Sequence, residues 1–417
     1  MEQTSAPGTC PFRLGRTADH DNLAEAREAA RLGPTPTVEL PGGVTARFVT
    51  RYGQARRILK SRNVSRDAYE NWPGFADGTR RVDGVVRNWV GTHNALNSSG
   101  AEHDRLRQPL AAALTRRQVN GIERLIETIT DSLLDDLAEL TPGTMDLQQH
   151  YIRKLPLMVI NTLLGIPEPL HEAFRHAVSG LFDTGATPER AMECMTTVVS
   201  LLDRLITQKR TRPGPDLISD LIQLNDAAGE CTLSDTELRD ECMLVISAGH
   251  ETTVNSIGNL LVHLLTHPEQ RELVANGHVT LERALEESLR HRSPIASVPL
   301  RFAVRDFEDP ETGDRFAAGE AILIGFAAVG RDQAVHGPDA DAFDVTRSTT
   351  QHLAFGHGVH FCPGAPLARM ESLIAVRGLL ERFPDCRLAV EEQELEFLPS
   401  FISNGYAALP VTLHPVE

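Results

Sequence analysis

Apolar residues recur at helical spacing along most of the chain. Between positions 118 and 140 they return at every third or fourth residue, as Ile122, Leu125, Ile126, Ile129, Leu133, Leu134 and Leu137. This spacing puts the stripe on one face and predicts an amphipathic helix. We therefore expect helices to dominate the fold.

A longer helix is predicted to follow Ser234. Ser234 and Glu237 have the spacing of a capping box, in which side chains and backbone amides at a helix start bond reciprocally. No proline interrupts the chain before Pro268. A helix of about 33 residues would be about 50 Å long and could cross the whole molecule. Because it is apolar over much of its circumference, we expect it in the centre.

Short β-rich segments lie on either side of this helix in the sequence. Residues 38–40 and 46–50 flank Pro41-Gly42-Gly43 and predict a hairpin. Residues 302–304, 315–317 and 321–324 predict a second small sheet. With no repeats and no long linker, we expect a mainly α protein with small β-sheets (α+β). We expect a polar tail over residues 1–20 and one domain over residues 21–417.

Charge and composition narrow the class of protein. The 417 residues hold 41 Lys and Arg against 57 Asp and Glu, a net charge of −16, which argues against a nucleic-acid binder. No apolar stretch reaches the ~18 residues of a membrane span. The start of the chain is polar and lacks the features of a signal peptide. We expect a cytoplasmic protein whose six scattered cysteines are free thiols.

One cysteine lies in the segment richest in glycine and histidine, residues 352–369. Gly356, Gly358 and Gly364 allow tight turns and close approach to a flat ligand. Pro363 suits a first helical position, so Cys362 would stand just ahead of a helix. The free amides of a helix start favour a thiolate, which acts as a metal ligand or a nucleophile.

Four interpretations of Cys362 compete. It is a buried structural cysteine, a zinc ligand together with His352, His357 and His360, or a catalytic thiol with a nearby histidine as base. The zinc interpretation is weakened because the spacing matches no usual zinc pattern. The fourth interpretation uses the whole string Phe355-x-x-Gly358-x-His360-x-Cys362-x-Gly364, which resembles the haem-binding loop of the cytochromes P450.

Three further motifs carry the same resemblance. Residues 248–253, Ala-Gly-His-Glu-Thr-Thr, are similar to the family's oxygen-binding stretch. Glu287 and Arg290 match its E-x-x-R helix, and His103 with Arg107 matches the helix that reaches a haem propionate. The likeness runs from about Pro36 onward. It implies the P450 fold, a triangular helical body around a buried haem b with a long central helix.

The resemblance implies a role for each matched residue. Cys362 would be the axial thiolate of the iron, in a loop completed by Phe355, Gly356 and Gly364. The propionates would be held by His103, Arg107, Arg301, His352 and His360. Ala248 and Gly249 would leave room for O2, while Thr252 and Glu251 would direct protons.

At one position the sequence departs from the family. Glu287 and Arg290 usually join a third basic residue downstream, and Ala342 stands where relatives usually have Arg. Either Arg347 replaces that residue or the network has only two members.

Substrate contacts are expected from the segments that would face the haem: residues 71–97, 174–187, 243–252, 295–299 and 401–404. The candidate wall residues are Trp72, Trp89, Phe182, Ala248, Ile295, Val298, Phe401 and Ile402. Most are apolar, so a hydrophobic or mixed-polarity small molecule is expected.

Electrons must come from another protein, because the chain has no flavin fingerprint and no Fe–S cysteine set. We expect a ferredoxin and an NAD(P)H-dependent ferredoxin reductase, with no nucleic-acid or membrane partner and with the enzyme as a monomer. Arg105, Arg116, Arg117 and Arg369 are the candidate docking cations.

The resulting hypothesis is a haem-thiolate monooxygenase that activates O2 to oxidise a small molecule, a secondary metabolite. Hydroxylation, epoxidation, dealkylation and oxidative coupling or ring closure remain open. A haem sensor or carrier is disfavoured because it has no need of the proton-delivering pair Glu251 and Thr252. A zinc or thiol protein is the remaining alternative.

Overall fold

The computed structural model describes residues 12–15, 21–40, 42–82, 84–119, 121–140, 143–182, 187–227 and 233–414. Helices make up most of these residues, as the sequence pattern predicts. The α-helices are α1 Asn22–Arg31, α2 Tyr52–Lys60, α3 Ala68–Asn71, α4 Gly84–Val90, α5 Gly100–Val119, α6 Ile122–Leu140, α7 Lys154–Leu164, α8 His171–Phe182, α9 Pro188–Thr211, α10 Leu217–Ala227, α11 Asp235–Thr266, α12 Pro268–Ala275, α13 Leu281–His291, α14 Phe326–Val329, α15 Gln333–His336 and α16 Ala365–Arg382.

The strands are short and belong to three small sheets. They are β1 Phe12–Arg13, β2 Thr37–Leu40, β3 Val44–Val49, β4 Val64–Ser65, β5 Gly143–Asp146, β6 Ser297–Ala303, β7 Phe307–Glu308, β8 Arg315–Phe316, β9 Ala321–Gly325, β10 Arg387–Leu388 and β11 Pro410–Leu413. Single turns of other helix types lie at η1 Gln148–Ile152, η2 Glu168–Leu170, η3 Gly358–His360 and η4 Glu392–Glu394.

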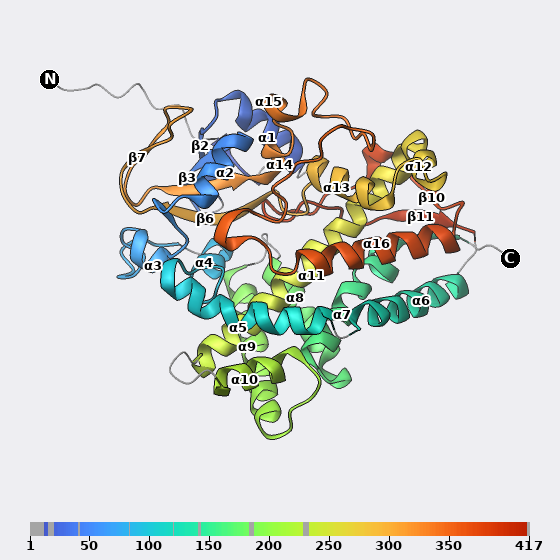
Figure 1. Cartoon of the computed structure of the whole chain (residues 1–417), viewed down its shortest axis with the longest axis horizontal. Coiled ribbons are helices and arrows are strands. Elements are labelled where there is room, and N and C mark those ends of the chain that lie inside the picture. The colour runs from blue at the N-terminus through green and yellow to red at the C-terminus, as the bar shows by residue number, and fades with distance from the viewer. Residues whose placement is uncertain are drawn as a thin grey trace.

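The long helix α11 crosses the molecule as predicted (Figure 1). It has 32 residues, and the capping box between Ser234 and Glu237 is present at its start. It packs against α7, α9, α13 and α16, and most of its residues from Val254 to Leu264 are buried. The helix therefore forms the centre of the helical core.

The predicted helix over 118–140 is interrupted near its start. Helix α5 ends at Val119 and α6 begins at Ile122, because Gly121 takes a φ of +88° that favours glycine. From Ile122 onward the predicted stripe faces the core, apart from the partly buried Leu125. The periodicity was a correct guide to the buried face but gave no sign of the break.

The main sheet has six strands in the order β1-β2-β3-β9-β6-β4. The predicted hairpin is confirmed as the antiparallel pair β2 and β3. The predicted second sheet is wrong: β6 and β9 join the main sheet, where β3 and β9 pair in parallel with Phe48 opposite Leu323. Only β8 is separate, and it pairs with β7.

Part of the predicted N-terminal tail belongs to this sheet. Phe12 and Arg13 pair in parallel with Val38 and Glu39 of β2, and Leu14 is buried. The expectation of a tail over residues 1–20 is therefore wrong for residues 12–15, and the other tail residues lie outside the described part of the chain.

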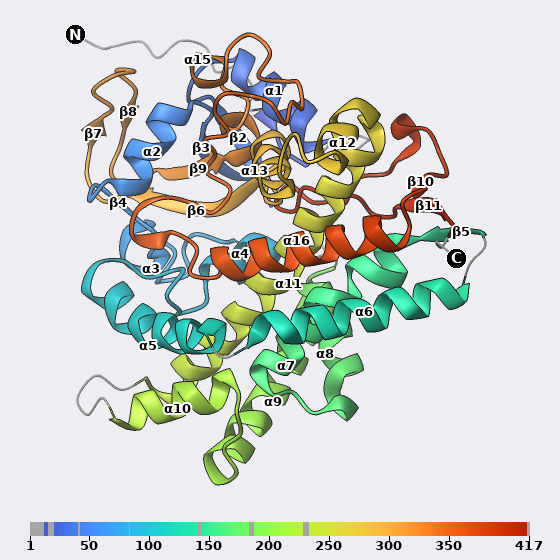
Figure 2. The ribbon, with the colours of Figure 1, turned by 45° about the vertical axis from the view of Figure 1, so that its right-hand side comes forward.

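The sheet and the helical body have separate hydrophobic clusters. One cluster lies under the main sheet and the other fills the space between the helices. Figure 2 shows the main sheet with α1 and α2 at one end of the molecule and α9 with α10 at the other. Among the described helices, none is both long enough and apolar enough to cross a lipid bilayer.

Candidate functional site

The loop before α16 is shaped by its glycines. Gly356 and Gly358 have φ values of +73° and +76°, in the region that favours glycine. A Cβ on Gly358 would lie only 2.7 Å from the carbonyl oxygen of Leu59 in α2. The Cys362 amide donates to the Phe355 carbonyl at 2.9 Å, which closes the loop. The loop is thus fixed against α2 and presents Cys362 at its end.

The Cys362 sulfur lies at the start of α16. Burial raises the pKa of its thiol, while the backbone amides of Gly364 and Ala365 and the charges of Arg107 and Arg369 oppose that rise. The helix begins at Ala365 with Pro366 in its first turn, so Pro363 lies before the helix and not at its first position. Helix-start amides aimed at a sulfur suit a thiolate ligand of a metal.

Four nitrogen-bearing side chains gather beside this loop, from segments far apart in the sequence. His103 of α5 and His360 of η3 have ring centroids 4.4 Å apart. Arg301 of β6 and Arg66, which follows β4, are close enough to disfavour each other's charge. We call His103, His360, Arg301 and Arg66 the cation cluster.

His103, Arg66 and Arg301 of the cation cluster are buried and His360 is half-buried, and neighbouring charges lower the pKa values of Arg66 and His360. Burial lowers the pKa of Arg301 to about 10, and burial together with the charges of Arg66 and Arg301 lowers that of His360 to about 2. His103 Nε2 and Arg301 Nη1 are buried and have no hydrogen-bond partner among the described residues. Two buried arginines, with an unpaired nitrogen of Arg301 and one of His103 beside them, fit an anion such as the carboxylates of a haem. The residues present therefore fit this group.

Arg66 was missed by the sequence prediction. It stands beside Arg301 because β4 pairs antiparallel with β6, with Ser65 opposite Phe302. No local signal in the sequence shows this pairing, because an arginine after a two-residue strand has no distinctive pattern.

Two predicted propionate cations have other partners in the structure. His352 Nε2 lies 2.9 Å from Glu286 Oε2, and its Nδ1 accepts from the Ala354 amide. Both ring nitrogens are used, so the propionate role predicted for His352 is corrected. Arg107 donates to the carbonyl of Phe361, which keeps it at the edge of the loop next to the cation cluster.

The zinc interpretation also fails on geometry. In the described part of the chain, His352, His357, His360 and Cys362 do not converge on one point; the single group of this kind is His93, Glu102 and Glu237 on the far side of α5. That group already surrounds the guanidinium of Arg105, which pairs with both carboxylates.

The oxygen-binding stretch predicted on α11 has the expected hydroxyl contact. Thr252 Oγ1 donates to the Ala248 carbonyl at 2.6 Å, one turn earlier, and Ala248 itself is exposed. Burial raises the pKa of Glu251, while the charge of Arg153 opposes that rise. Gly249 also lies against α7: a Cβ there would lie 2.5 Å from Ile160 Cδ1. The role predicted for Gly249 in oxygen binding stays a prediction.

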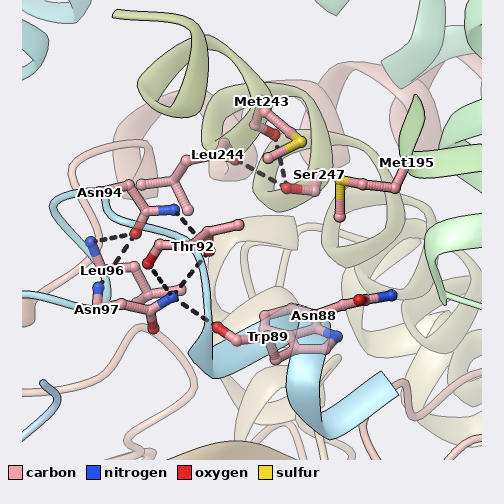
Figure 3. A pocket seen from close by; sticks show the side chains of 10 residues that line it. All are labelled: Asn88, Trp89, Thr92, Asn94, Leu96, Asn97, Met195, Met243, Leu244 and Ser247. Atoms are coloured by element: carbon pink, nitrogen blue, oxygen red, sulfur yellow. Dashed lines mark hydrogen bonds between the residues drawn. The ribbon is translucent and has the colours of Figure 1, made fainter. Parts of the chain in front are cut away.

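A cleft lies between α4, α9, α11 and the loop after α4 (Figure 3). Its lining residues are Asn88, Trp89, Thr92, Asn94, Leu96, Asn97, Met195, Met243, Leu244 and Ser247. All but Met195 fall within the segments predicted to contact substrate. Met195 was missed because nothing in the sequence places α9 beside α11.

Of the predicted wall residues, Trp89 lines this cleft. Trp72 does not; it is 3% exposed and stacks on Phe75 in the core under the sheet. Ile295, Val298, Phe401 and Ile402 lie together in that same core cluster, where Ala296 bonds to Ile402. The side chain of Phe182 lies outside the described part of the structure.

The Glu287 and Arg290 pair is fully buried, with nitrogen–oxygen distances of 2.7 and 2.8 Å. Arg347 Nε adds a third contact, 3.3 Å from Glu287 Oε1. The alternative in which Arg347 replaces the missing arginine is therefore confirmed.

Comparison with known proteins agrees with this geometry. The family model described as cytochrome P450 matches residues 171–276 and 279–398. The chain is 36% identical over 407 residues to 2-hydroxy-5-methyl-1-naphthoate 7-hydroxylase of Streptomyces carzinostaticus, covering 97% of this chain and 98% of that one.

Solved structures give the same result. CYP154A1 from Streptomyces coelicolor A3(2) superposes with a TM-score of 0.89 at 42% identity, covering 97% of this chain and 100% of that one. Testosterone-bound CYP154C4 from Streptomyces sp. ATCC 11861 gives 0.91 at 36% identity, with 98% and 99% covered. With the cysteine loop, the buried Glu–Arg network and the long central helix all in the matching arrangement, the chain belongs to the cytochromes P450 and is a haem-thiolate monooxygenase.

Proposed function

We propose that the loop ending at Cys362 would hold the haem of this enzyme through the Cys362 thiolate, with helix α11 supplying the residues for proton delivery. A bound haem-thiolate supplies the O2 activation and oxygen transfer of this family. The amides of Gly364 and Ala365 stabilise negative charge on the sulfur. The ring of Phe355, with the Arg369 guanidinium 4.3 Å from its centroid, shields the loop from water.

The observation that carries this proposal is the cation cluster beside the cysteine loop. Arg66, Arg301, His103 and His360 are the residues we assign to the haem carboxylates, with Arg107 at their edge. An anion in this place would relieve the mutual repulsion of the arginines and would accept from the unused His103 and Arg301 donors.

On the other side of the haem, this chain supplies a hydroxyl and a carboxyl for proton delivery. The Thr252 hydroxyl donates to Ala248, so its oxygen is oriented by the helix and its lone pairs remain available. The raised pKa of Glu251 lets this buried carboxyl hold a proton that it passes toward Thr252. Exposed Ala248 leaves space next to this hydroxyl.

The substrate we propose is a small secondary metabolite that the enzyme hydroxylates. The naphthoate 7-hydroxylase and the testosterone-bound CYP154C4 indicate a small polycyclic molecule. The cleft supports this because it combines Trp89, Met195 and Leu244 with asparagine and hydroxyl side chains.

A ferredoxin, reduced by an NAD(P)H-dependent reductase in the cytoplasm, is the proposed electron donor. Val359 and Phe361, which flank His360 near Cys362, are 62% and 45% exposed, and Lys60 and Arg107 lie beside them. None of the four arginines predicted from the sequence to dock the electron donor is among these exposed residues. Arg105 is bound to Glu102 and Glu237, Arg369 is bound to Glu286, and the side chains of Arg116 and Arg117 lie outside the described structure.

The test is the spectrum of the reduced carbon monoxide complex. Wild type should show the red-shifted Soret band typical of thiolate ligation, and Cys362→His should lose it. Cys386→Ala and Cys194→Ala, which remove other buried free thiols, should keep the band. A red-shifted band in Cys362→His, or its loss in either control variant at full haem content, would assign the ligand to another group.

A further inference from the structure

The cleft shown in Figure 3 has an uncharged lining. Its ten lining residues in the described structure contain amides, hydroxyls, thioethers, an indole and leucines, but no charged side chain. An ionised ligand group entering this space would lose water without gaining a counter-charge, which costs several kcal/mol.

Glu241, whose carboxyl group lies behind the cleft, does not add a full negative charge to this lining. Glu241 of α11 accepts from the Ala95 amide at 2.6 Å, and Ala95 lies between the lining residues Asn94 and Leu96. Burial raises the pKa of Glu241 to about 8, so this carboxyl is largely neutral at pH 7. It therefore offers no anion to a positively charged ligand.

Most polar side chains of the cleft already form hydrogen bonds within the loop after α4. Asn94 Oδ1 accepts from the amides of Leu96 and Asn97. Asn97 Nδ2 donates to the Trp89 carbonyl at 2.6 Å and to Thr92, and its Oδ1 accepts from Arg66. These groups fix the shape of the wall and have little capacity left for a ligand.

Two polar side chains of the lining can still form hydrogen bonds with a ligand. Asn88 makes no hydrogen bond within the described part of the chain, and its amide points away from Asn94 and Asn97 (Figure 3). Ser247 Oγ donates to the Met243 carbonyl at 2.7 Å, which leaves its lone pairs to accept. Asn88 can donate and accept, so together the two residues match a hydroxyl group, which would accept from Asn88 and donate to Ser247.

Helix α11 connects this pair to the proposed oxidation site. Leu244, Ala248 and Thr252 are four residues apart and share one helix face. Leu244 lines the cleft, and Thr252 lies eight residues further, about 12 Å along the helix. A ligand in the cleft therefore lies beside the helix face that continues to Thr252.

We propose that Asn88 and Ser247 form a recognition site for one hydroxyl group of an elongated, neutral, polycyclic substrate. The assignment rests on the proposed function, since it takes the Thr252 face of α11 as the place of oxidation. It selects between the ligand types of the two relatives, a neutral steroid and an anionic naphthoate, in favour of the neutral type.

Charge is tested by a matched pair of probes, 2-hydroxy-5-methyl-1-naphthoate and its methyl ester, which differ in one negative charge. Titration of the Soret band of the holoenzyme should show the ester binding at least about tenfold more tightly than the acid, since desolvating an unpaired carboxylate is costly. Testosterone, also neutral, should bind as well. Tighter binding of the acid would overturn the proposal, as would the absence of binding by both neutral probes.

Recognition is tested with Asn88→Leu, which keeps the size of the side chain, and with testosterone analogues that lack either the 3-keto or the 17-hydroxyl group. Asn88→Leu should weaken testosterone binding about fivefold, the effect of one neutral hydrogen bond. For the analogue that lacks the 17-hydroxyl, wild type and variant should bind equally. Ser247→Ala should lower the affinity for the same analogues as Asn88→Leu does, and exposed Asn276→Leu should have no effect.

An equal loss for testosterone and both analogues would show that Asn88 only packs, and no loss at all would show that it faces elsewhere. Either result would overturn the recognition site. The carbon monoxide spectrum of the same preparations distinguishes this from failure of the proposed function: a red-shifted band with unaltered probe binding contradicts only the recognition site.

Discussion

Arg347 completes a buried network with Glu287, although the two residues are sixty positions apart in the chain. Glu287 Oε1 accepts from Arg290, from Arg347 and from the Asp344 amide. Arg290 also donates to the carbonyls of Gly330 and Ala340. The network thus ties α13 to the segment that precedes the cysteine loop, and this explains how the chain manages without an arginine at position 342.

Arg347→Ala should therefore destabilise the protein strongly. The substitution removes one of two cations that compensate a fully buried carboxylate, which costs about 3–5 kcal/mol of unfolding free energy. Urea unfolding followed by circular dichroism measures the loss, with Arg377→Ala as control. Arg377 pairs with Glu282 at the surface, so its removal should cost no more than about 1 kcal/mol. Equal losses in the two variants would show that Arg290 alone satisfies Glu287.

The sequence predicted the helical part of the fold because buried helix faces leave a local pattern. The stripe from Ile122 to Leu137 and the cap at Ser234 needed no knowledge of the rest of the chain. The pairing of Phe48 with Leu323 leaves no such pattern, since strand partners are set by the whole fold. For that reason one sheet was predicted as two, and the strand at Phe12 was missed.

Within the candidate site, the residues of sequence motifs were predicted better than the residues that strand pairing and helix packing bring to the site. Cys362, Thr252 and Glu287 lie in strings whose spacing is informative. Arg66 and Met195 reach their places through strand pairing and helix packing, so no string contains them. For Gly249, the motif gave no sign of its packing against Ile160.

Haem retention tests the cation cluster. Arg301→Ala and Arg66→Ala should each lower the haem-to-protein ratio after purification and weaken haemin binding to the haem-free protein at least about tenfold, since each leaves a buried carboxylate with fewer donors. Arg305→Ala, an exposed residue bonded to Asn63 at 2.8 Å, is the control and should leave both unchanged. In the haem-free protein, Arg66→Ala should cost little stability, because it also removes repulsion of Arg301. Full haem content in both variants would place the carboxylates elsewhere.

The pH dependence of stability should report Glu241. Burial raises its pKa in the folded state to about 8 from the ordinary value of 4.5, so between these values the folded state binds more protons than the unfolded state. Stability from this group is therefore fully present below about pH 4.5 and is lost as the pH rises through 8, by at most about 1.4 kcal/mol per pH unit.

Glu241→Gln removes this titration and keeps an oxygen for the Ala95 amide. The melting temperature of the variant minus that of wild type should grow from pH 6 to about pH 8 and then level off. Taking the difference cancels the buried histidines such as His250, whose lowered pKa acts in the opposite sense below pH 6.5. A difference that stays constant with pH would show that Glu241 is ionised throughout.

Coupling of electron use to product formation should depend on the Thr252 hydroxyl. Thr252→Ala removes the hydroxyl that bonds to the Ala248 carbonyl on α11, while it keeps helix propensity high. With a substrate found by Soret titration and a ferredoxin system, the variant should consume NAD(P)H but release hydrogen peroxide in place of most product. The measured quantities are product formed per NAD(P)H consumed, and peroxide in parallel.

A matched control lies on the same helix. Thr266 makes the same bond one turn back, to the Val262 carbonyl at 2.8 Å, but lies at the far end of α11. Thr266→Ala should therefore couple as wild type does, and Thr252→Ser, which restores the hydroxyl, should recover most of the coupling. Glu251→Gln should instead slow oxygen consumption itself, because the buried carboxyl passes the proton onward. If Thr252→Ala retains wild-type coupling, proton delivery follows a route that does not include this hydroxyl, and the assignment of Thr252 is wrong even though the family assignment stands.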